Sequence, residues 1–337
     1  MSLRVDYIVE PRKWNEFIVT YAPQSLFQSW LWGEVQRKIG NTVARFGFYE
    51  GGTLMGVAQT VLVSARRGTF LHVRHGPVLA DDTLALWRFV LAHLSSEAKI
   101  QRCLFVRMSP LIAENDKTKE LFQTLHTVPS AIHRMDGEYC WVLDLSPSEE
   151  ALLAGMRKST RYEIRKGQKD GVRVFATSDP KRLTAFFDLY KATSTRHGFV
   201  PHSGIREEFE VFAKENQATL YLGEYRGRVT AAAIVLYVAH QAIYHHGASV
   251  QSQTPVSPLV QWEAIREAKK RGMKVYNFWG IAPYDSPKHP WRGITLFKKG
   301  FGGREIRYMH AHDLPISPWY VIPRTIELVR RVSRGYD

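Results

Sequence analysis

The chain has 337 residues, of which 45% are hydrophobic, so it can form two domains that each bury a core. Lysine and arginine outnumber aspartate and glutamate by 46 to 32, and the resulting net charge of +14 favours a polyanionic partner such as RNA, a diphosphate or an anionic membrane face. The longest apolar stretch, Thr230 to Ala239, is too short to span a membrane, and no signal segment is visible, so we expect a cytoplasmic protein.

The elements predicted from the first half of the chain return in the second half. The first set comprises a strand-turn-strand segment over 45–58, a strand over 69–73, a helix over 83–98 and a strand over 103–108. The second set comprises a strand-turn-strand segment over 220–232, a strand over 241–245, a helix over 257–271 and a strand over 273–278. This agreement in order and spacing predicts two copies of one mixed α/β module, with the domain boundary after residue 145.

Cysteine and histidine usage argues against a metal centre. Cys103 and Cys140 lie in apolar, strand-like segments without C-x-x-C spacing, which predicts two buried free thiols. The 13 histidines form neither an H-E-x-x-H pattern nor a cluster with cysteine, so we expect no metal.

A basic stripe marks the helix predicted over 157–169. Arg157, Arg161, Arg165 and Lys169 recur every four residues, which places them on one face. Because like charges at this spacing repel, the stripe favours contact with phosphate or RNA backbone over a merely solvated face.

The segment 289–303 sets Lys298 between Phe297 and a glycine-rich bend formed by Gly300, Gly302 and Gly303. A cation held beside apolar surface, where backbone can approach closely, is suited to stabilising a negative charge that develops during a reaction. A surface lysine beside a structural turn is the alternative interpretation.

Two motifs resemble those of the Fem (FemABX) family of peptidoglycan-bridge aminoacyltransferases. Residues 289–303 match H-P-x-x-G followed by F-K-x-G-F-G-G, and residues 161–166 match a basic R-x-x-I-R-K helix, followed by G-V at 171–172. The resemblance implies two tandem GNAT-like acyltransferase domains, 1–145 and 146–312, with a C-terminal tail, 313–337, that packs on the first. The chain resembles the compact form of the family, without a coiled-coil arm.

The family's activity implies a reaction for this chain. A Gly, Ala or Ser residue would pass from aminoacyl-tRNA to the side-chain amine of a UDP- or lipid-linked muramyl peptide precursor. The activated ester drives this transfer, so no cofactor is expected. We also expect a monomer. Its basic C-terminal tail is a candidate for peripheral contact with an anionic membrane.

The resemblance also implies roles for individual residues. Lys298 would be catalytic, near the tRNA 3′ end, and the basic stripe would contact tRNA. Tyr244 and His246 would share one face of a strand in the precursor pocket. The remaining substrate-binding candidates, which match family motifs or lie beside Lys298, are Phe297, Trp32, Gln36, Lys38, Arg107, Ser109, Arg196 and His202.

Ser109 and His202 depart from the family pattern. Ser109 stands where members have an aspartate and cannot act as a carboxylate base, so that role is either missing or assisted by the substrate. His202 stands where members have a basic residue that meets the nucleotide diphosphate. These departures leave open a non-catalytic RNA- or envelope-binding relative.

A GNAT-type N-acyltransferase acting on a different amine is a further alternative. An acetyl-CoA enzyme of this type needs a glycine-rich loop whose amides hold pyrophosphate. Residues 249–258 lack glycine and contain two prolines, which disfavours acetyl-CoA.

Overall fold

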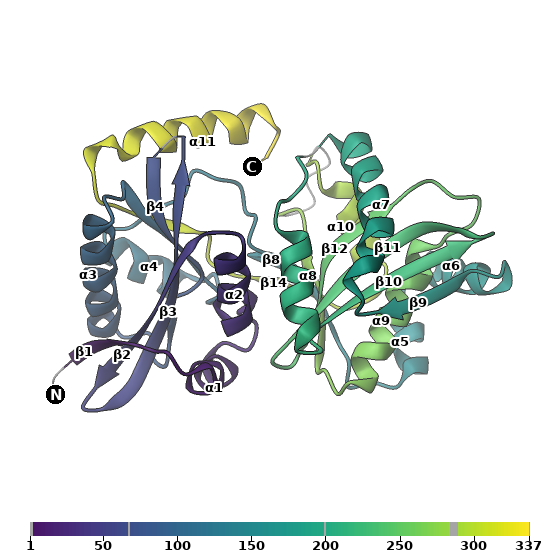
Figure 1. The fold of residues 1–337 in the computed structure, drawn as a ribbon, viewed down its shortest axis with the longest axis horizontal. Coiled ribbons are helices and arrows are strands. Elements are labelled where there is room, and N and C mark those ends of the chain that lie inside the picture. Colours follow the sequence, from purple (N-terminus) through teal and green to yellow (C-terminus); the bar gives the residue numbers. More distant parts are fainter. Residues whose placement is uncertain (1–2, 67, 199, 284–288, 337) are drawn as a thin grey trace. The chain divides into compact units, whose positions relative to one another are not determined.

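The computed structural model describes residues 3–66, 68–198, 200–283 and 289–336, which divide into two compact units. Unit 1 comprises Met1–Tyr139, Ala282–Arg292 and Ile306–Asp337, and unit 2 comprises Cys140–Ile281 and Gly293–Glu305 (Figure 1). Each unit has one sheet flanked by helices, which confirms the mixed α/β prediction. Within the described residues, no helix combines the length and apolar character needed to cross a membrane.

Unit 1 is built around an eight-stranded sheet with the order β1-β2-β3-β4-β6-β15-β7, and β5 pairs with β3 outside this path. Its strands are β1 (Leu3–Tyr7), β2 (Thr42–Glu50), β3 (Thr53–Ala65), β4 (Gly68–His75), β5 (Val78–Leu79), β6 (Phe105–Pro110), β7 (Val128–Pro129) and β15 (His312–Pro315). Its helices are α1 (Pro11–Tyr21), η1 (Leu26–Gln28), α2 (Trp30–Lys38), α3 (Leu84–Ile100), α4 (Asp116–Thr124), η3 (Pro318–Tyr320) and α11 (Val321–Ser333).

Alternation along the strands separates the two faces of this sheet. Phe46 and Phe48 of β2 point to one face, where α3 contributes Trp87, Val90 and Leu94 to the same core. Helix α1 packs on the other face around Trp14. Figure 1 shows α3 on one side of the sheet and α1 and α2 on the other.

Unit 2 is built around a seven-stranded sheet with the order β14-β8-β13-β12-β11-β10-β9. Its strands are β8 (Tyr139–Asp144), β9 (Arg173–Thr177), β10 (Ala218–Tyr225), β11 (Arg228–Val238), β12 (Gln241–Ser249), β13 (Val275–Gly280) and β14 (Arg304–Arg307). Its helices are α5 (Glu149–Gly155), α6 (Lys158–Lys169), η2 (Pro180–Arg182), α7 (Leu183–His197), α8 (Ile205–Lys214), α9 (Ser257–Lys270) and α10 (Arg292–Lys299).

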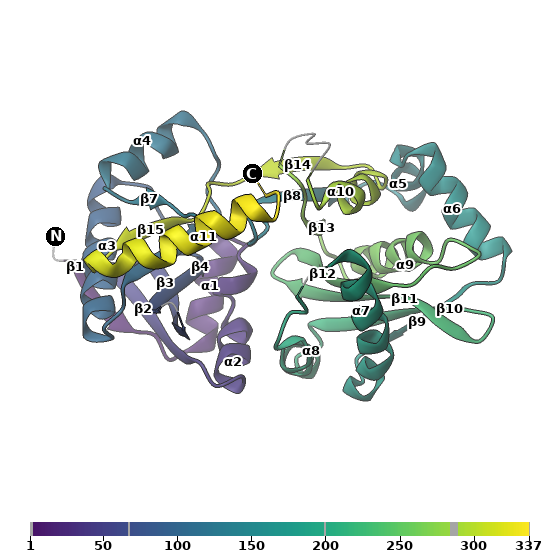
Figure 2. The ribbon, with the colours of Figure 1, turned by 90° about the horizontal axis from the view of Figure 1, so that it is seen from above.

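Helices also cover both faces of the second sheet. Helices α5, α6 and α9 bury Leu152, Ile164 and Ile265 against one face, whereas α7 and α8 pack on the other (Figure 2).

Both predicted thiols, Cys103 and Cys140, are buried and free. Gly198 ends α7 with φ of 67°, a left-handed conformation that favours glycine.

The two sheets repeat one strand order, in which β1, β2, β3, β4 and β6 correspond to β9, β10, β11, β12 and β13. The next position is filled by β15 in unit 1 and by β8 in unit 2. For this reason Cys140 to Leu145 belong to unit 2, although the sequence placed them in the first domain. Residues 282–292 and 306–312, predicted in the second domain, belong to unit 1.

The C-terminal tail is attached to unit 1 by a buried ion cluster. Arg107 is 3% exposed and binds Asp313 of β15 through Nε and Nη2, at 2.7 and 2.8 Å. It also binds Glu327 of α11 through Nη1 and Nη2, at 3.1 and 2.7 Å. Figure 2 shows α11 lying across the strands of this sheet. Arg107 was predicted to bind substrate, but its guanidinium instead makes paired hydrogen bonds to two carboxylates of the C-terminal tail and fastens the tail to the sheet.

We expect Arg107→Ala to lower the free energy of unfolding by about 3–5 kcal/mol, because Asp313 and Glu327 would remain buried without their partner. Urea denaturation measures this change. Arg12→Ala breaks the exposed pair with Glu16 and should cost less than about 1 kcal/mol. Similar losses for the two variants would contradict the anchoring role.

Candidate functional site

Two neighbouring parallel strands part at their carboxyl ends in unit 2. Strands β12 and β13 pair only from Gln241 with Val275 to Ile243 with Asn277, although they run on to Ser249 and Gly280. Both strands are irregular past this point, since the β11–β12 and β13–β8 ladders each shift register there. In sheets of this kind ligands bind beyond the carboxyl ends of parallel strands.

The corresponding strands of unit 1 stay together. Strands β4 and β6 pair from Leu71 with Val106 to His75 with Pro110, so both remain paired up to their last residues. The parted strand ends therefore distinguish unit 2 and point to it as the place where a ligand can approach the backbone.

Lys298 reaches the parted end of β13 from the last turn of α10. Its side chain is buried, and Nζ donates a hydrogen bond to the carbonyl oxygen of Gly280 at 2.5 Å. Burial lowers the pKa of Lys298 to about 7, against a small opposing effect of Cys140. Burial also raises the pKa of the Cys140 thiol to about 12, so this thiol is neutral. Lys298 can therefore gain or lose its charge near neutral pH.

The glycine-rich bend lets α10 approach β8. Gly302 and Gly303 have φ of 78° and 96°, and a Cβ on Gly303 would lie 2.2 Å from the carbonyl oxygen of Val142. The indole of Trp141 donates to the carbonyl oxygen of Gly302 at 2.6 Å. Phe297, next to Lys298, is partly buried and packs against the core. The close backbone approach predicted from the glycines is confirmed.

Trp279 holds an unusual conformation between Lys298 and the next strand. Its φ is 67°, a region that bulky residues rarely occupy, and its N–H donates to Oδ1 of Asn277 at 2.8 Å. Its ring meets that of His245 on β12, with centroids 4.9 Å apart and planes at 83°. Strand β12 thus contacts the residue that precedes Gly280.

His245 and His246 converge on one buried carboxylate. Ile234 pairs with His246 and Val235 with Tyr244, which leaves His245 as the extra residue of a β-bulge. Nδ1 of His245 and Nε2 of His246 each lie 3.0 Å from Oε1 of Glu208 on α8. Burial alone would raise the pKa of Glu208, but the two imidazoles outweigh it and hold this pKa well below its usual range.

The bulge corrects the predicted arrangement of Tyr244 and His246. Tyr244 packs into the core beside Val235, where burial raises its pKa to about 12, whereas His246 faces α8. The predicted shared face was wrong because the extra residue shifts the period-two alternation by one. Glu208 and His245 were missed by sequence reasoning. An acidic residue on the apolar face of a helix, between Ile205 and Phe209, was the available signal for Glu208.

Glu208, His245 and His246 are also of the types that bind metals, and their ligand atoms lie within 4.8 Å of one another. The sequence had led us to expect no metal, because its histidines form neither an H-E-x-x-H pattern nor a cluster with cysteine. The hydrogen bonds within the trio satisfy Oε1 of Glu208 without an ion.

Two further candidates lie beside this cluster. The His202 ring is 6.2 Å from the His246 ring, and its backbone N–H donates to the Tyr190 hydroxyl at 3.3 Å. Arg196 donates from Nη2 to the carbonyl oxygen of Ser249, the last residue of β12, at 3.0 Å. Arg196, His202 and His246 therefore surround the free end of β12.

The basic helix begins at the glycine-rich bend. The helix starts at Lys158, one residue later than predicted, and the N–H of its N-cap, Arg157, donates to the carbonyl oxygen of Gly300 at 2.9 Å. Arg161 caps the preceding helix by donating to the carbonyl oxygens of Ala154 and Met156. Arg157, Arg165 and Lys169 remain exposed. The two motifs that lie far apart in the sequence thus meet in unit 2.

The unit 1 candidates have structural contacts. Trp32 is buried against Phe27, with ring centroids 4.5 Å apart, and Oε1 of Gln36 accepts from Asn41 at 2.9 Å. Lys38 is exposed at the end of α2. The Trp32 ring also lies 5.5 Å from the Arg74 guanidinium carbon.

A carboxylate stands next to Ser109 even though the motif lacks it. The buried Ser109 hydroxyl donates to Oδ2 of Asp136 at 2.9 Å, while Oδ1 of Asp136 accepts from Arg74 at 3.0 and 2.5 Å. Burial alone would raise the pKa of Asp136, but Arg74 and nearby histidines outweigh it and hold it below its usual range. A carboxylate so engaged is a weak proton acceptor.

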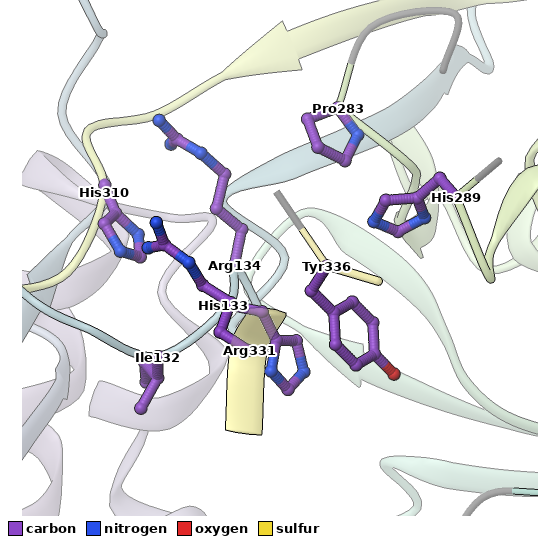
Figure 3. A pocket seen from close by; sticks show the side chains of 8 residues that line it. All are labelled: Ile132, His133, Arg134, Pro283, His289, His310, Arg331 and Tyr336. Carbon is purple, nitrogen blue, oxygen red and sulfur yellow. The ribbon is translucent and has the colours of Figure 1, made fainter. Parts of the chain in front are cut away.

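Unit 1 also contains a cavity of about 260 Å³ (Figure 3). Its lining is Ile132, His133, Arg134, Pro283, His289, His310, Arg331 and Tyr336. Burial, with the nearby charges of Arg334 and His289, lowers the pKa of His133 to about 4. The lining includes none of the residues predicted for the site.

The sequence matches a known family along most of its length. The model of the FemAB family matches residues 9–136, 121–222 and 205–327. The chain is 26% identical over 226 residues to UDP-N-acetylmuramoylpentapeptide-lysine N(6)-alanyltransferase of Weissella viridescens, a match that covers 63% of this chain and 66% of the relative. It is 36% identical over 73 residues to aminoacyltransferase FemA of Staphylococcus epidermidis, covering 21% and 18%. The matches thus span just under two thirds of the first relative and under a fifth of the second.

Solved structures show the same fold. The crystal structure of FemX superposes with a TM-score of 0.82 at 15% identity, covering 97% of this chain and 100% of that one. A tandem GNAT protein from the clavulanic acid biosynthesis pathway superposes with a TM-score of 0.62 at 9% identity, covering 94% and 99%. These likenesses confirm the prediction of two GNAT-like units.

We expect Lys298→Met to change how stability depends on pH. In the folded chain the Lys298 amine keeps its proton up to about pH 7. In the unfolded chain it keeps this proton up to the ordinary lysine pKa of 10.5. Between these values the unfolded state holds more protons. The unfolding free energy of the wild type should therefore rise with pH, relative to Lys298→Met, by up to about 1.4 kcal/mol per unit.

Urea denaturation at pH 7, 8 and 9 measures this difference, with Lys299→Met as the control for loss of a neighbouring lysine. A constant difference between wild type and Lys298→Met across this range would show that Lys298 keeps an ordinary pKa.

Proposed function

This chain belongs to the FemAB family, and from that membership we propose that it transfers an amino acid from aminoacyl-tRNA to the side-chain amine of a peptidoglycan precursor stem peptide. Two relatives support this proposal, since one is a muramoylpentapeptide-lysine alanyltransferase and the other an aminoacyltransferase. Because the donor is a tRNA, we expect the reaction in the cytoplasm, on a UDP-linked precursor or on a lipid-linked one at the membrane face.

The observation that carries the proposal is the buried Lys298 at the parted end of β13. Attack of an amine on the ester carbonyl forms the C–N bond and leaves a negative oxygen in the tetrahedral intermediate. An ammonium fixed in an apolar environment stabilises this charge more than it would in water. With a pKa near 7, Lys298 is available as the ammonium at neutral pH.

The remaining charged groups suit two anionic substrates. Exposed Arg165 and Lys169 on α6 offer contacts to the tRNA backbone, and the start of this helix lies at the bend that follows Lys298. Arg196 and His202 at the end of β12 offer a site for a precursor diphosphate, in place of the basic residue that the family motif has. Holding donor and acceptor together supplies much of the catalysis in such a transfer.

We expect Lys298→Met to reduce transfer by about 10²–10³-fold, because the oxyanion loses its cation. The assay offers radiolabelled alanyl-, seryl- and glycyl-tRNA in turn to UDP-linked muramyl pentapeptide and to its lipid-linked form. Lys299→Met is the matched control and should stay within about threefold of wild type.

Labelled precursor made by the wild type and lost in Lys298→Met, with tRNA binding retained, would support the proposal and identify the amino acid. Wild-type protein that neither binds charged tRNA nor labels either acceptor would contradict it.

A further inference from the structure

The proposed transfer requires a group that accepts a proton from the attacking amine. The family motif has an aspartate where this chain has Ser109, and Asp136 beside it is held by Arg74. On the basis of the proposed function, we infer that His246 is the base that takes this proton and that Glu208 is the residue that positions it.

The hydrogen bonds of His246 set its tautomer. Nε2 lies 3.0 Å from Oε1 of Glu208, an acceptor-only carboxylate, so Nε2 carries the hydrogen. The lone pair is then on Nδ1. Nδ1 has no hydrogen-bond partner among the described residues, and the His246 side chain keeps 9% of its surface exposed. An imidazole held at one nitrogen and open at the other is suited to accept a proton from a bound amine.

The environment of Glu208 keeps its carboxylate ionised where it contacts the His246 ring. Its side chain is 4% exposed and accepts from two imidazoles, which hold its pKa low despite burial. A buried carboxylate in this place orients the ring and stabilises the imidazolium that forms on proton transfer. Oε1 of Glu208 also holds His245, whose position in the bulge allows both rings to reach this one oxygen.

The cluster is connected to Lys298 by direct contacts within unit 2. The His245 ring packs against Trp279, and the next residue, Gly280, accepts the hydrogen bond from Lys298. His246 thus lies on one of the two parted strands, β12, and Lys298 of α10 binds the end of the other strand, β13. A base on one side and a cation on the other match the two charges of an aminoacyl transfer, the amine proton and the oxyanion.

The proton transfers balance in this scheme. The neutral amine attacks the ester carbonyl, the C–N bond forms, and the proton from the nitrogen passes to Nδ1 of His246. The C–O bond to the tRNA 3′ oxygen then breaks, and the imidazolium returns the proton to that oxygen. The products are the amide and a tRNA with a free 3′ hydroxyl.

The test measures single-turnover transfer from pH 6 to pH 9 for wild type, His246→Gln and Glu208→Gln. We expect His246→Gln to lose about 100-fold or more in rate, with tRNA and precursor affinity retained, because general-base catalysis contributes at this level. His240→Gln, an exposed histidine between β11 and β12, is the matched control and should transfer as wild type does.

The pH profile separates catalysis from structure. Among the residues that the structure describes, the titratable groups nearest His246 are Glu208, His245 and His202. Glu208→Gln keeps a hydrogen-bonding oxygen but removes the charge that favours imidazolium, so the acidic limb of the profile should move to lower pH. Added imidazole should partly restore transfer to His246→Ala, which a purely structural role would not allow. The two Gln variants provide independent tests if the Ala variant fails to fold.

Three results would overturn the inference. In the first, His246→Gln transfers within threefold of wild type while Lys298→Met is inactive, so the proposed function stands but the base lies elsewhere. In the second, metal analysis finds one zinc per wild-type chain that is lost in Glu208→Gln, so the trio is a metal site. In the third, the wild type shows no transfer to any acceptor, and the inference falls together with the proposed function.

Discussion

The parting of β12 and β13 is the constraint on which the candidate site depends. Backbone pairing stops after Ile243 and Asn277, and the freed strand ends need other partners for their polar groups. Lys298 supplies one of these partners by donating to Gly280, and the bulge at His245 turns two imidazoles toward Glu208. The corresponding strands of unit 1 remain paired to their ends, where Ser109 and Arg74 bind Asp136 instead. One interruption of a sheet thus accounts for the placement of these charged groups.

The two units use buried charge in opposite ways. In unit 1, Arg107 is paired with Asp313 and Arg74 with Asp136, so the charges are neutralised. These ion pairs hold the C-terminal tail and the segment between β7 and β8 in place. In unit 2, Lys298 is buried with no carboxylate partner in the described part of the chain, and this burial lowers its pKa toward neutrality. A matched pair stabilises a fold, whereas an unmatched cation costs stability and can respond to a substrate's charge.

Much of the fold could be predicted from the sequence, because strands, turns and helices depend largely on residues that are close together in the chain. The strand-turn-strand segments and the helices that follow them are short-range signals, and the repeat of these signals predicted two modules. Contacts that join distant segments could not be predicted. Arg107 with Asp313, Ser109 with Asp136, and Glu208 with His246 each depend on the folded topology. The bulge was also invisible, since a single extra residue in a strand leaves no mark in composition but reverses which side chains share a face.

The central claim is that Lys298, at the parted strand ends of unit 2, is a lysine of lowered pKa that faces the reacting ester. The most direct measurement is an NMR titration of the Lys298 ammonium, assigned by comparison with Lys298→Met. It is made with and without a stable amide analogue of the 3′-aminoacyl end of tRNA. The account predicts a pKa near 7 in the free protein and a change in this signal when the analogue binds. Titration at the ordinary lysine pKa, unaffected by a bound analogue, would contradict the account.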